Sequence, residues 1–288
     1  MLTIKAYAKI NLYLDVISRY PGGYHQIESV MQSVSLHDLV EISRAPTIDI
    51  ACAKKELCNQ DNLAFRAAKL LQQKAGLRVG AKINIDKRIP TSAGLAGGSA
   101  DAAATLTGLN ILWRLGLSLE QLQEIGLELG ADVPFCLAGG TMLAGGKGEL
   151  LSPLNPMPEA AIVLATPPIY VSTAEVYQAL DLENLTPLNR KDKVLDALDA
   201  RDIARLAGSL DNLLESAVLK RYPKISEFKQ FALTAGGIGT SMSGSGPSVF
   251  TICRDGYSAD EIADAMRAYD PSFFVEIIKP VDRGVEVL

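Results

Sequence analysis

The chain has 288 residues, of which 48% are hydrophobic, so it can bury one large core or two of ordinary size. Its 28 basic and 33 acidic side chains give a net charge of −5 at neutral pH. That balance supplies no general attraction for nucleic acid or acidic membranes, so we expect neither as a partner, and any phosphate site must be local.

Sequence features that report on compartment favour a cytoplasmic protein. The amino-terminal stretch MLTIKAYAKINLYLDV places Lys5, Lys9 and Asp15 among its apolar residues, unlike a secretion signal. Later apolar segments are too short to cross a bilayer. The cysteines lack the paired C-x-x-C spacing of a zinc site, and we expect buried free thiols at Cys52, Cys58, Cys136 and Cys253.

The first strand pattern contains two polar residues that could bind a ligand. Residues 6–15 alternate in a way that predicts a strand with Lys9 and Asn11 on one face, where both could address the same ligand. The alternative is that Lys9 is an ordinary solvated lysine on the strand surface. The glycine-led loop that follows holds Tyr24 and His25, which could recognise a base by stacking and hydrogen bonding, or be incidental.

Two amphipathic patterns predict helices in the first half of the chain. Residues 61–76 fit a helix that closes at Gly76 and packs on a sheet. Residues 118–130 fit a second helix, capped by Ser118 with Gln121 at the capping-box position. The residues expected to face inward are Leu63, Ala67, Leu70 and Leu71 in the first helix and Leu119, Leu122, Ile125 and Leu129 in the second.

A glycine-rich turn between these helices separates a strand pattern from an alanine-rich helix pattern. The alternation over 79–86 predicts a strand that ends near Pro90, and a helix should begin near Gly98 or Ser99. Glycines just before a helix start let backbone N–H groups and the helix dipole stabilise an anion. A turn that uses glycine only for its dihedral angles is the alternative.

The rest of the chain supplies a carboxylate and a second glycine-rich turn. Asp132 follows the helix-ending Gly130 and, if near Lys9, could accept the proton of an attacking hydroxyl group. Composition shifts near Leu151 to Glu159, where we expect a lobe boundary. Beyond it come a strand over 160–165, helices over 174–180 and 193–219, and the turn 235–250, which fits either a hairpin or a phosphate-binding loop.

Taken together, PTSAGLAGGSAD, AYAKINLYLDV, GGYHQIESVMQSVSLHD, LGADVPFCLAGGTMLAGGKGE and MSGSGPSVF resemble the GHMP kinase superfamily. The resemblance implies an α+β, two-lobed fold. Residues 1–153 would form an amino-terminal lobe like domain 2 of ribosomal protein S5, with the ATP phosphate loop, and residues 154–288 a ferredoxin-like lobe. ATP and Mg²⁺ are implied as cofactors, in a monomer or homodimer.

The order of these motifs is most similar to the members that phosphorylate a cytidine diphosphate alcohol in non-mevalonate isoprenoid biosynthesis. By resemblance, Lys9 and Asp132 match the catalytic pair, while Asn11, Tyr24 and His25 match substrate contacts. Ser99 matches a magnesium-side hydroxyl. The residues that match the ATP loop are Pro90, Thr91, Ser92, Ala93, Gly94, Leu95, Ala96, Gly97, Gly98, Ser99 and Ala100.

Two residues depart from the family pattern, and two rival functions stay open. Ala96 stands where many members carry glycine, which puts nucleotide affinity in doubt, and Ala100 replaces serine. A homoserine or mevalonate type of kinase is one alternative, against which Gly23, Tyr24 and His25 argue. The other is a sensor that binds nucleotide without turnover.

Overall fold

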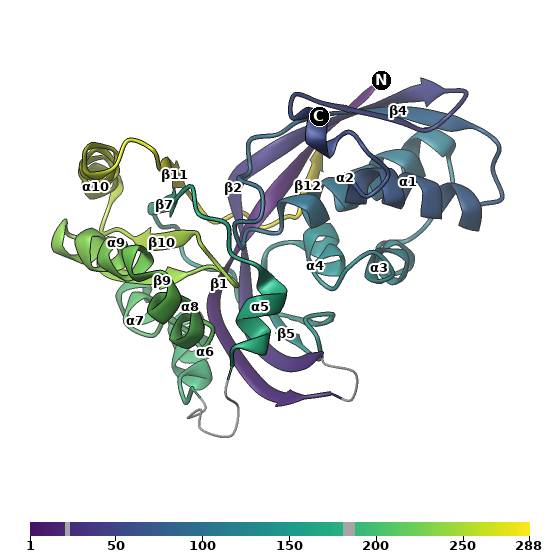
Figure 1. The fold of residues 1–288 in the computed structure, drawn as a ribbon. Helices are drawn as coiled ribbons and strands as arrows, with labels where there is room; N and C mark the ends of the chain where they lie inside the picture. Colours follow the sequence, from purple (N-terminus) through teal and green to yellow (C-terminus); the bar gives the residue numbers. More distant parts are fainter. Residues whose placement is uncertain (21–23, 181–187) are drawn as a thin grey trace.

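A computed structural model describes residues 1–20, 24–180 and 188–288 of the chain, so Gly23 lies outside the described residues. The fold is α+β and contains two β-sheets, each with its own helices (Figure 1). Over the described residues, no helix has the length and apolarity to span a lipid bilayer.

The larger sheet has eight strands and is built around two long ones, β1 and β2, which pair antiparallel. Its main order is β12-β1-β2-β4-β3, while β5 pairs with β2 and β6, and β8 pairs with β1. The strands are β1 (Leu2–Arg19), β2 (His25–Ala45), β3 (Asp49–Cys52), β4 (Gly80–Asp86), β5 (Thr141–Gly145), β6 (Leu150–Pro153), β8 (Asp211–Asn212) and β12 (Val285–Val287).

Strand β1 runs through the centre of the molecule (Figure 1), and both of its faces are covered. All residues from Ala6 to Val16 are buried, so the alternation does not mark a solvent face. Lys9 is only 4% exposed, which excludes the solvated lysine. The β1–β2 register shifts between Tyr7 and Ala8 and again between Asn11 and Tyr13, and such bulges redirect side chains near functional sites.

Helix α2 (Gly97–Trp113) is the central helix of this lobe, and its small side chains permit close packing against β1, β2 and the neighbouring helices. The predicted cap at Ser118 is confirmed as a capping box. Two expectations were wrong: α1 packs mainly on α2 rather than on the sheet, and Leu119 is exposed. The other helices here are the 3₁₀ helix η1 (Lys55–Leu57), α1 (Leu63–Lys74), α3 (Leu119–Leu127) and α4 (Val133–Ala138).

The smaller sheet is antiparallel in the order β11-β7-β10-β9. Its chain order, strand, helices, two strands, helix and strand, is that of a ferredoxin-like unit. The elements are β7 (Ile162–Thr166), β9 (Gly239–Met242), β10 (Val249–Ile252), β11 (Phe274–Ile278), α5 (Thr173–Gln178), α6 (Lys191–Asp199), α7 (Ile203–Ala207), α8 (Glu215–Arg221), α9 (Pro223–Thr234) and α10 (Gly256–Tyr269).

Details of the second half differ from the sequence pattern. The helical region expected over 193–219 is divided into α6, α7 and α8, with β8 between the last two. The boundary after residue 153 stays a prediction. Strands β8 and β12 lie beyond that residue in the sequence, yet both hydrogen-bond to β1 in the first sheet. All four cysteines are free, but only Cys136 and Cys253 are buried, because Cys52 and Cys58 lie near the surface in β3 and after η1.

Candidate active site

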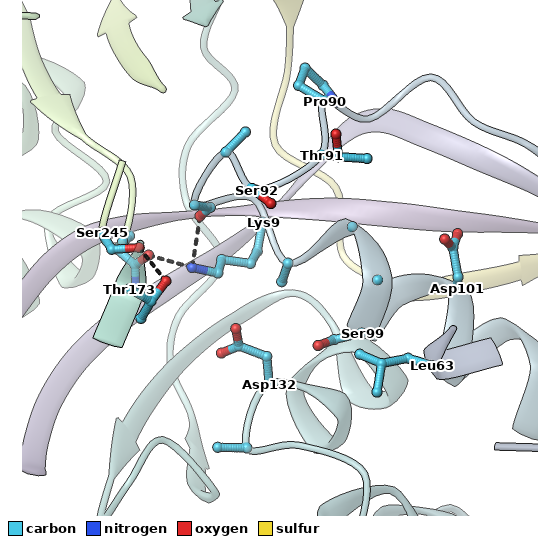
Figure 2. A pocket seen from close by; sticks show the side chains of 18 of the residues that line it. Lys9, Leu63, Pro90, Thr91, Ser92, Ser99, Asp101, Asp132, Thr173 and Ser245 are labelled. Atoms are coloured by element: carbon cyan, nitrogen blue, oxygen red, sulfur yellow. Dashed lines mark hydrogen bonds between the residues drawn. The ribbon is translucent and has the colours of Figure 1, made fainter. Parts of the chain in front are cut away.

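A cavity of about 650 Å³ brings most of the predicted residues together (Figure 2). Its lining comes from both halves of the chain: β1, the loop before α2, the start of α4, α5 and the turn after β9. A second cavity of about 680 Å³ contains none of the predicted site residues, so volume alone does not identify the site. The predicted residues that line the first cavity are Lys9, Asn11, Pro90, Thr91, Ser92, Ala93, Gly94, Ala96, Gly97, Gly98, Ser99 and Asp132.

The glycine-rich turn joins β4 to α2 as expected, and α2 begins at Gly97, within one or two residues of the prediction. No side chain caps the start of α2, so the cavity adjoins uncapped first-turn N–H groups at the positive end of the helix dipole. Leu95 and Ala100 of the predicted loop are buried in the core. This arrangement fits an anion in the cavity.

Ala96, the departure from the family pattern, has a left-handed backbone with φ of 55°. That conformation costs about 1–2 kcal/mol for a residue with a Cβ, which explains why glycine suits this position. The strain lies in the residue that directly precedes the helix. Ala96 therefore fixes the loop at a cost in stability, while its effect on nucleotide affinity stays a prediction.

The Lys9 ammonium is held by two acceptors on different segments. Its Nζ donates to Asn11 Oδ1 at 2.6 Å and to the Gly94 carbonyl at 3.0 Å (Figure 2). The same carbonyl accepts from Ser243 Oγ at 2.9 Å. The predicted common face of Lys9 and Asn11 is therefore confirmed, and the loop before α2, β1 and the second glycine-rich turn meet at Gly94.

Asp132 lies on the cavity wall at the start of α4, and its side chain makes no capping hydrogen bond. Its carboxylate and the Lys9 ammonium point into the same space in Figure 2. Among the described residues the two do not form an ion pair, and the Lys9 ammonium is bonded to Asn11 and Gly94. A ligand between them would contact an acceptor on one side and a cation on the other.

A buried ion cluster that the sequence patterns did not predict lies next to the loop that precedes α2. Lys87 Nζ lies 2.5 Å from Asp38 and 2.7 Å from Asp101, and all three side chains are buried. Asp38 also accepts the backbone N–H groups of Arg88 and Ile89. Burial raises the pKa of Asp101, while the adjacent Lys87 ammonium opposes that shift. The cluster ties the end of β4 to β2 and to α2.

One aromatic ring, that of Tyr177, lines the cavity, and two others lie beside it. The His25 ring packs on Tyr177 with centroids 4.9 Å apart, and Lys147 lies 4.3 Å from the centroid of Tyr24, which is 64% exposed. Tyr177 and Lys147 line the cavity, whereas Tyr24 and His25 do not. Tyr24 and His25 thus each contact a residue that is distant in sequence, and their role in recognising a base stays a prediction.

Comparison with known proteins identifies the family to which this chain belongs. Residues 62–140 match the family "GHMP kinases N terminal domain", and residues 194–272 match "GHMP kinases C terminal". The 4-diphosphocytidyl-2-C-methyl-D-erythritol kinase of Alkaliphilus metalliredigens is 45% identical over 88% of each chain, and that of Gloeobacter violaceus is 43% identical over 98% of this chain and 95% of its own. The chain belongs to this kinase family.

Solved structures agree with the kinase assignment and with the predicted two-lobed GHMP fold. A crystal structure of 4-(cytidine 5'-diphospho)-2C-methyl-D-erythritol kinase has a TM-score of 0.81 at 32% identity and covers 96% of this chain and 98% of its own. A homoserine kinase from Cytophaga hutchinsonii has a TM-score of 0.78 at 20% identity and covers 100% and 97%. The second match shows only that the kinase fold is shared.

Several lining residues of this kinase were missed by sequence reasoning. Thr173 at the start of α5 and Ser245 in the second glycine-rich turn share a hydrogen bond of 2.7 Å between their hydroxyl oxygens. Tyr177 lies one helical turn after Thr173, on the same side of α5. For Ser245, the dense hydroxyl content of the surrounding turn was a sequence signal for a ligand site. For Thr173 and Tyr177 there was none, because no local pattern predicts that α5 reaches the cavity.

The donors in the cavity fit a magnesium–nucleotide complex. Mg²⁺ takes few protein oxygens and completes its shell with water and phosphate oxygens. The hydroxyl of Ser99, two residues into α2, lines the cavity beside the uncapped helix start. The described residues contain no group of three or more His, Cys, Asp or Glu side chains that could enclose a metal by themselves. A phosphate-bound Mg²⁺ suits this donor set.

Proposed function

We propose that this kinase transfers the γ-phosphoryl group of ATP to the 2-hydroxyl group of 4-diphosphocytidyl-2-C-methyl-D-erythritol. The observation that carries the proposal is the single cavity that joins an anion-binding helix start, a buried cation at Lys9 and a carboxylate at Asp132. Phosphoryl transfer requires mainly alignment and charge stabilisation, and this set of groups supplies both.

In this mechanism the triphosphate lies against residues 90–100, and the acceptor hydroxyl group lies between Lys9 and Asp132. The hydroxyl oxygen bonds to the γ-phosphorus as the bond to the β,γ-bridging oxygen breaks, and its proton passes to Asp132. Lys9 stabilises the negative charge on the transferred group. Ser99 would hold Mg²⁺, which when bound neutralises phosphate charge.

The aromatic cluster accounts for the nucleotide part of the acceptor. Tyr24, His25 and Tyr177 offer ring faces and a hydrogen-bonding imidazole beside the cavity, which suits a pyrimidine base. Lys147 adds a positive charge within reach of a diphosphate. His25→Ala should therefore raise the KM for the cytidine substrate much more than the KM for ATP.

The function is tested by ADP release from purified protein with ATP, Mg²⁺ and the cytidine substrate, with homoserine and mevalonate as rival acceptors. We expect turnover with the cytidine compound alone. Asp132→Asn should retain ATP binding and lose at least 100-fold in kcat, because the proton acceptor is removed. Unchanged kcat in that variant would contradict the role of Asp132, and turnover with homoserine would contradict the acceptor.

A further inference from the structure

Three buried side chains on β1 and β2 form a continuous hydrogen-bonded chain that ends at Lys9. Asn11 Nδ2 donates to Ser29 Oγ at 2.8 Å, and Ser29 Oγ donates to the Tyr13 carbonyl at 2.6 Å. At the other end, Asn11 Oδ1 accepts from Lys9 Nζ at 2.6 Å. Ser29 is fully buried and does not line the cavity, and Asn11 is 1% exposed.

The chemistry of these groups permits only one direction for the chain. A carbonyl oxygen only accepts, so the Ser29 hydroxyl proton is committed to Tyr13 and the Ser29 oxygen is left to accept. The Asn11 amide must then present its NH₂ group to Ser29. Its oxygen faces Lys9 as a result, which is what an ammonium with donors alone requires.

We propose that Ser29 is a positioning residue for phosphoryl transfer: it fixes the orientation of the Asn11 amide, which in turn holds the Lys9 ammonium. This inference rests on the proposed role of Lys9. It adds a function for Ser29, which contacts neither the cavity nor Lys9, and it gives Asn11 a part in placing the cation.

Loss of the Ser29 hydroxyl group leaves the buried NH₂ group of Asn11 without its acceptor, so Lys9 alone then orients the amide. An amide that turns toward another acceptor draws its oxygen away from Lys9, and only the Gly94 carbonyl would then hold Nζ. The ammonium would be displaced from its place in the cavity. Substrate binding residues elsewhere in the cavity would be untouched.

The experiment compares Ser29→Ala in the wild-type background and in an Asn11→Asp background. A carboxylate presents an oxygen to Lys9 in either orientation, so it needs no hydroxyl group to orient it. We expect Ser29→Ala to lower kcat roughly tenfold in the wild type, the rate equivalent of one hydrogen bond, with the KM for ATP within about twofold. In Asn11→Asp the same substitution should change kcat less than about twofold.

A matched control lies on the same strand. Ser33 is 1% exposed and pairs with Lys9 in the β1–β2 register, but its Oγ has no hydrogen-bond partner among the described residues. Ser33→Ala should leave kcat unchanged. Ser29→Thr keeps the hydroxyl group and should keep kcat. Should Ser29→Ala fail to fold, Ser29→Cys replaces it, because a thiol is only a weak donor and acceptor.

Equal losses of kcat from Ser29→Ala in both backgrounds, or no loss in the wild type, would overturn the proposal. An NMR signal of Lys9 Nζ, assigned with Lys9→Met, reads the same contact without any substrate. It should shift in Ser29→Ala and stay in place in Ser33→Ala, and an unshifted signal would also overturn the inference. If the Lys9 signal shifts in Ser29→Ala as expected but the wild type does not turn over the cytidine compound, the proposed function alone is refuted.

Discussion

The contact between the two glycine-rich loops can be tested at Gly94. Its φ of +75° lies in the left-handed region, and a Cβ built there would lie 1.9 Å from the Ser243 carbonyl oxygen. Gly94→Ala therefore carries a backbone penalty of about 1–2 kcal/mol and forces backbone of the second loop to move, at about 1–3 kcal/mol. The lower entropy of the unfolded alanine chain recovers about 0.4–1 kcal/mol.

The expected net loss in the free energy of unfolding is about 3 kcal/mol, which corresponds to a decrease of about 6 °C in Tm for a chain of this size. Calorimetry and urea unfolding measure it directly. The Gly94 carbonyl also accepts from Lys9 and from Ser243, so its displacement should lower kcat as well.

Gly98→Ala provides the matched control in the same loop-to-helix segment. A Cβ at Gly98 meets only Leu63 Cδ1 at 3.4 Å, an ordinary contact, and the residue lies in the first turn of α2. Alanine should be neutral there or stabilise by up to about 0.5 kcal/mol, because it loses less entropy in a helix. Equal stability of the two variants, or a native-like Gly94→Ala, would refute the proposed close approach.

Two further predictions concern charged groups other than the proposed catalytic pair. Lys87→Met leaves Asp38 and Asp101 buried without their cation and should cost about 3 kcal/mol in urea unfolding, whereas Arg88→Met breaks only the exposed pair with Asp86 and should cost under about 1 kcal/mol. Similar losses would refute the role of the cluster. Burial lowers the pKa of His25 below its usual 6.5, so the unfolded chain binds the proton first and stability should fall as the pH decreases below about 6.5. The urea midpoint of His25→Gln should fall less between pH 7.5 and 5.5, and an equal fall would contradict this.

Local patterns were enough to predict the parts of the site that are local in sequence. The alternation before Pro90 and the small residues after Gly97 define a strand, a turn and a helix whatever surrounds them. The i, i+2 spacing likewise placed Lys9 and Asn11 on one face. These features depend on the geometry of a single segment.

The missed features depend on packing between distant segments. Lys87, which follows β4, forms an ion pair with Asp38 on the paired strand β2. The His25 ring packs on Tyr177 of α5, a helix much later in the chain. Leu119 has the spacing of an inward residue yet is 45% exposed. Periodicity identifies an apolar face but does not state where the neighbouring element stops.

The second glycine-rich turn shows why its two interpretations do not exclude each other. It is a hairpin connection, since β9 and β10 pair on either side of it. Asn212 Nδ2 donates to the carbonyls of Met242 and Gly244 and so fixes the turn against β8, which pairs with β1. Held there, Gly244 and Ser245 line the cavity and Ser243 binds the Gly94 carbonyl that also binds Lys9. The hairpin fold is therefore what places this turn beside the loop that precedes α2.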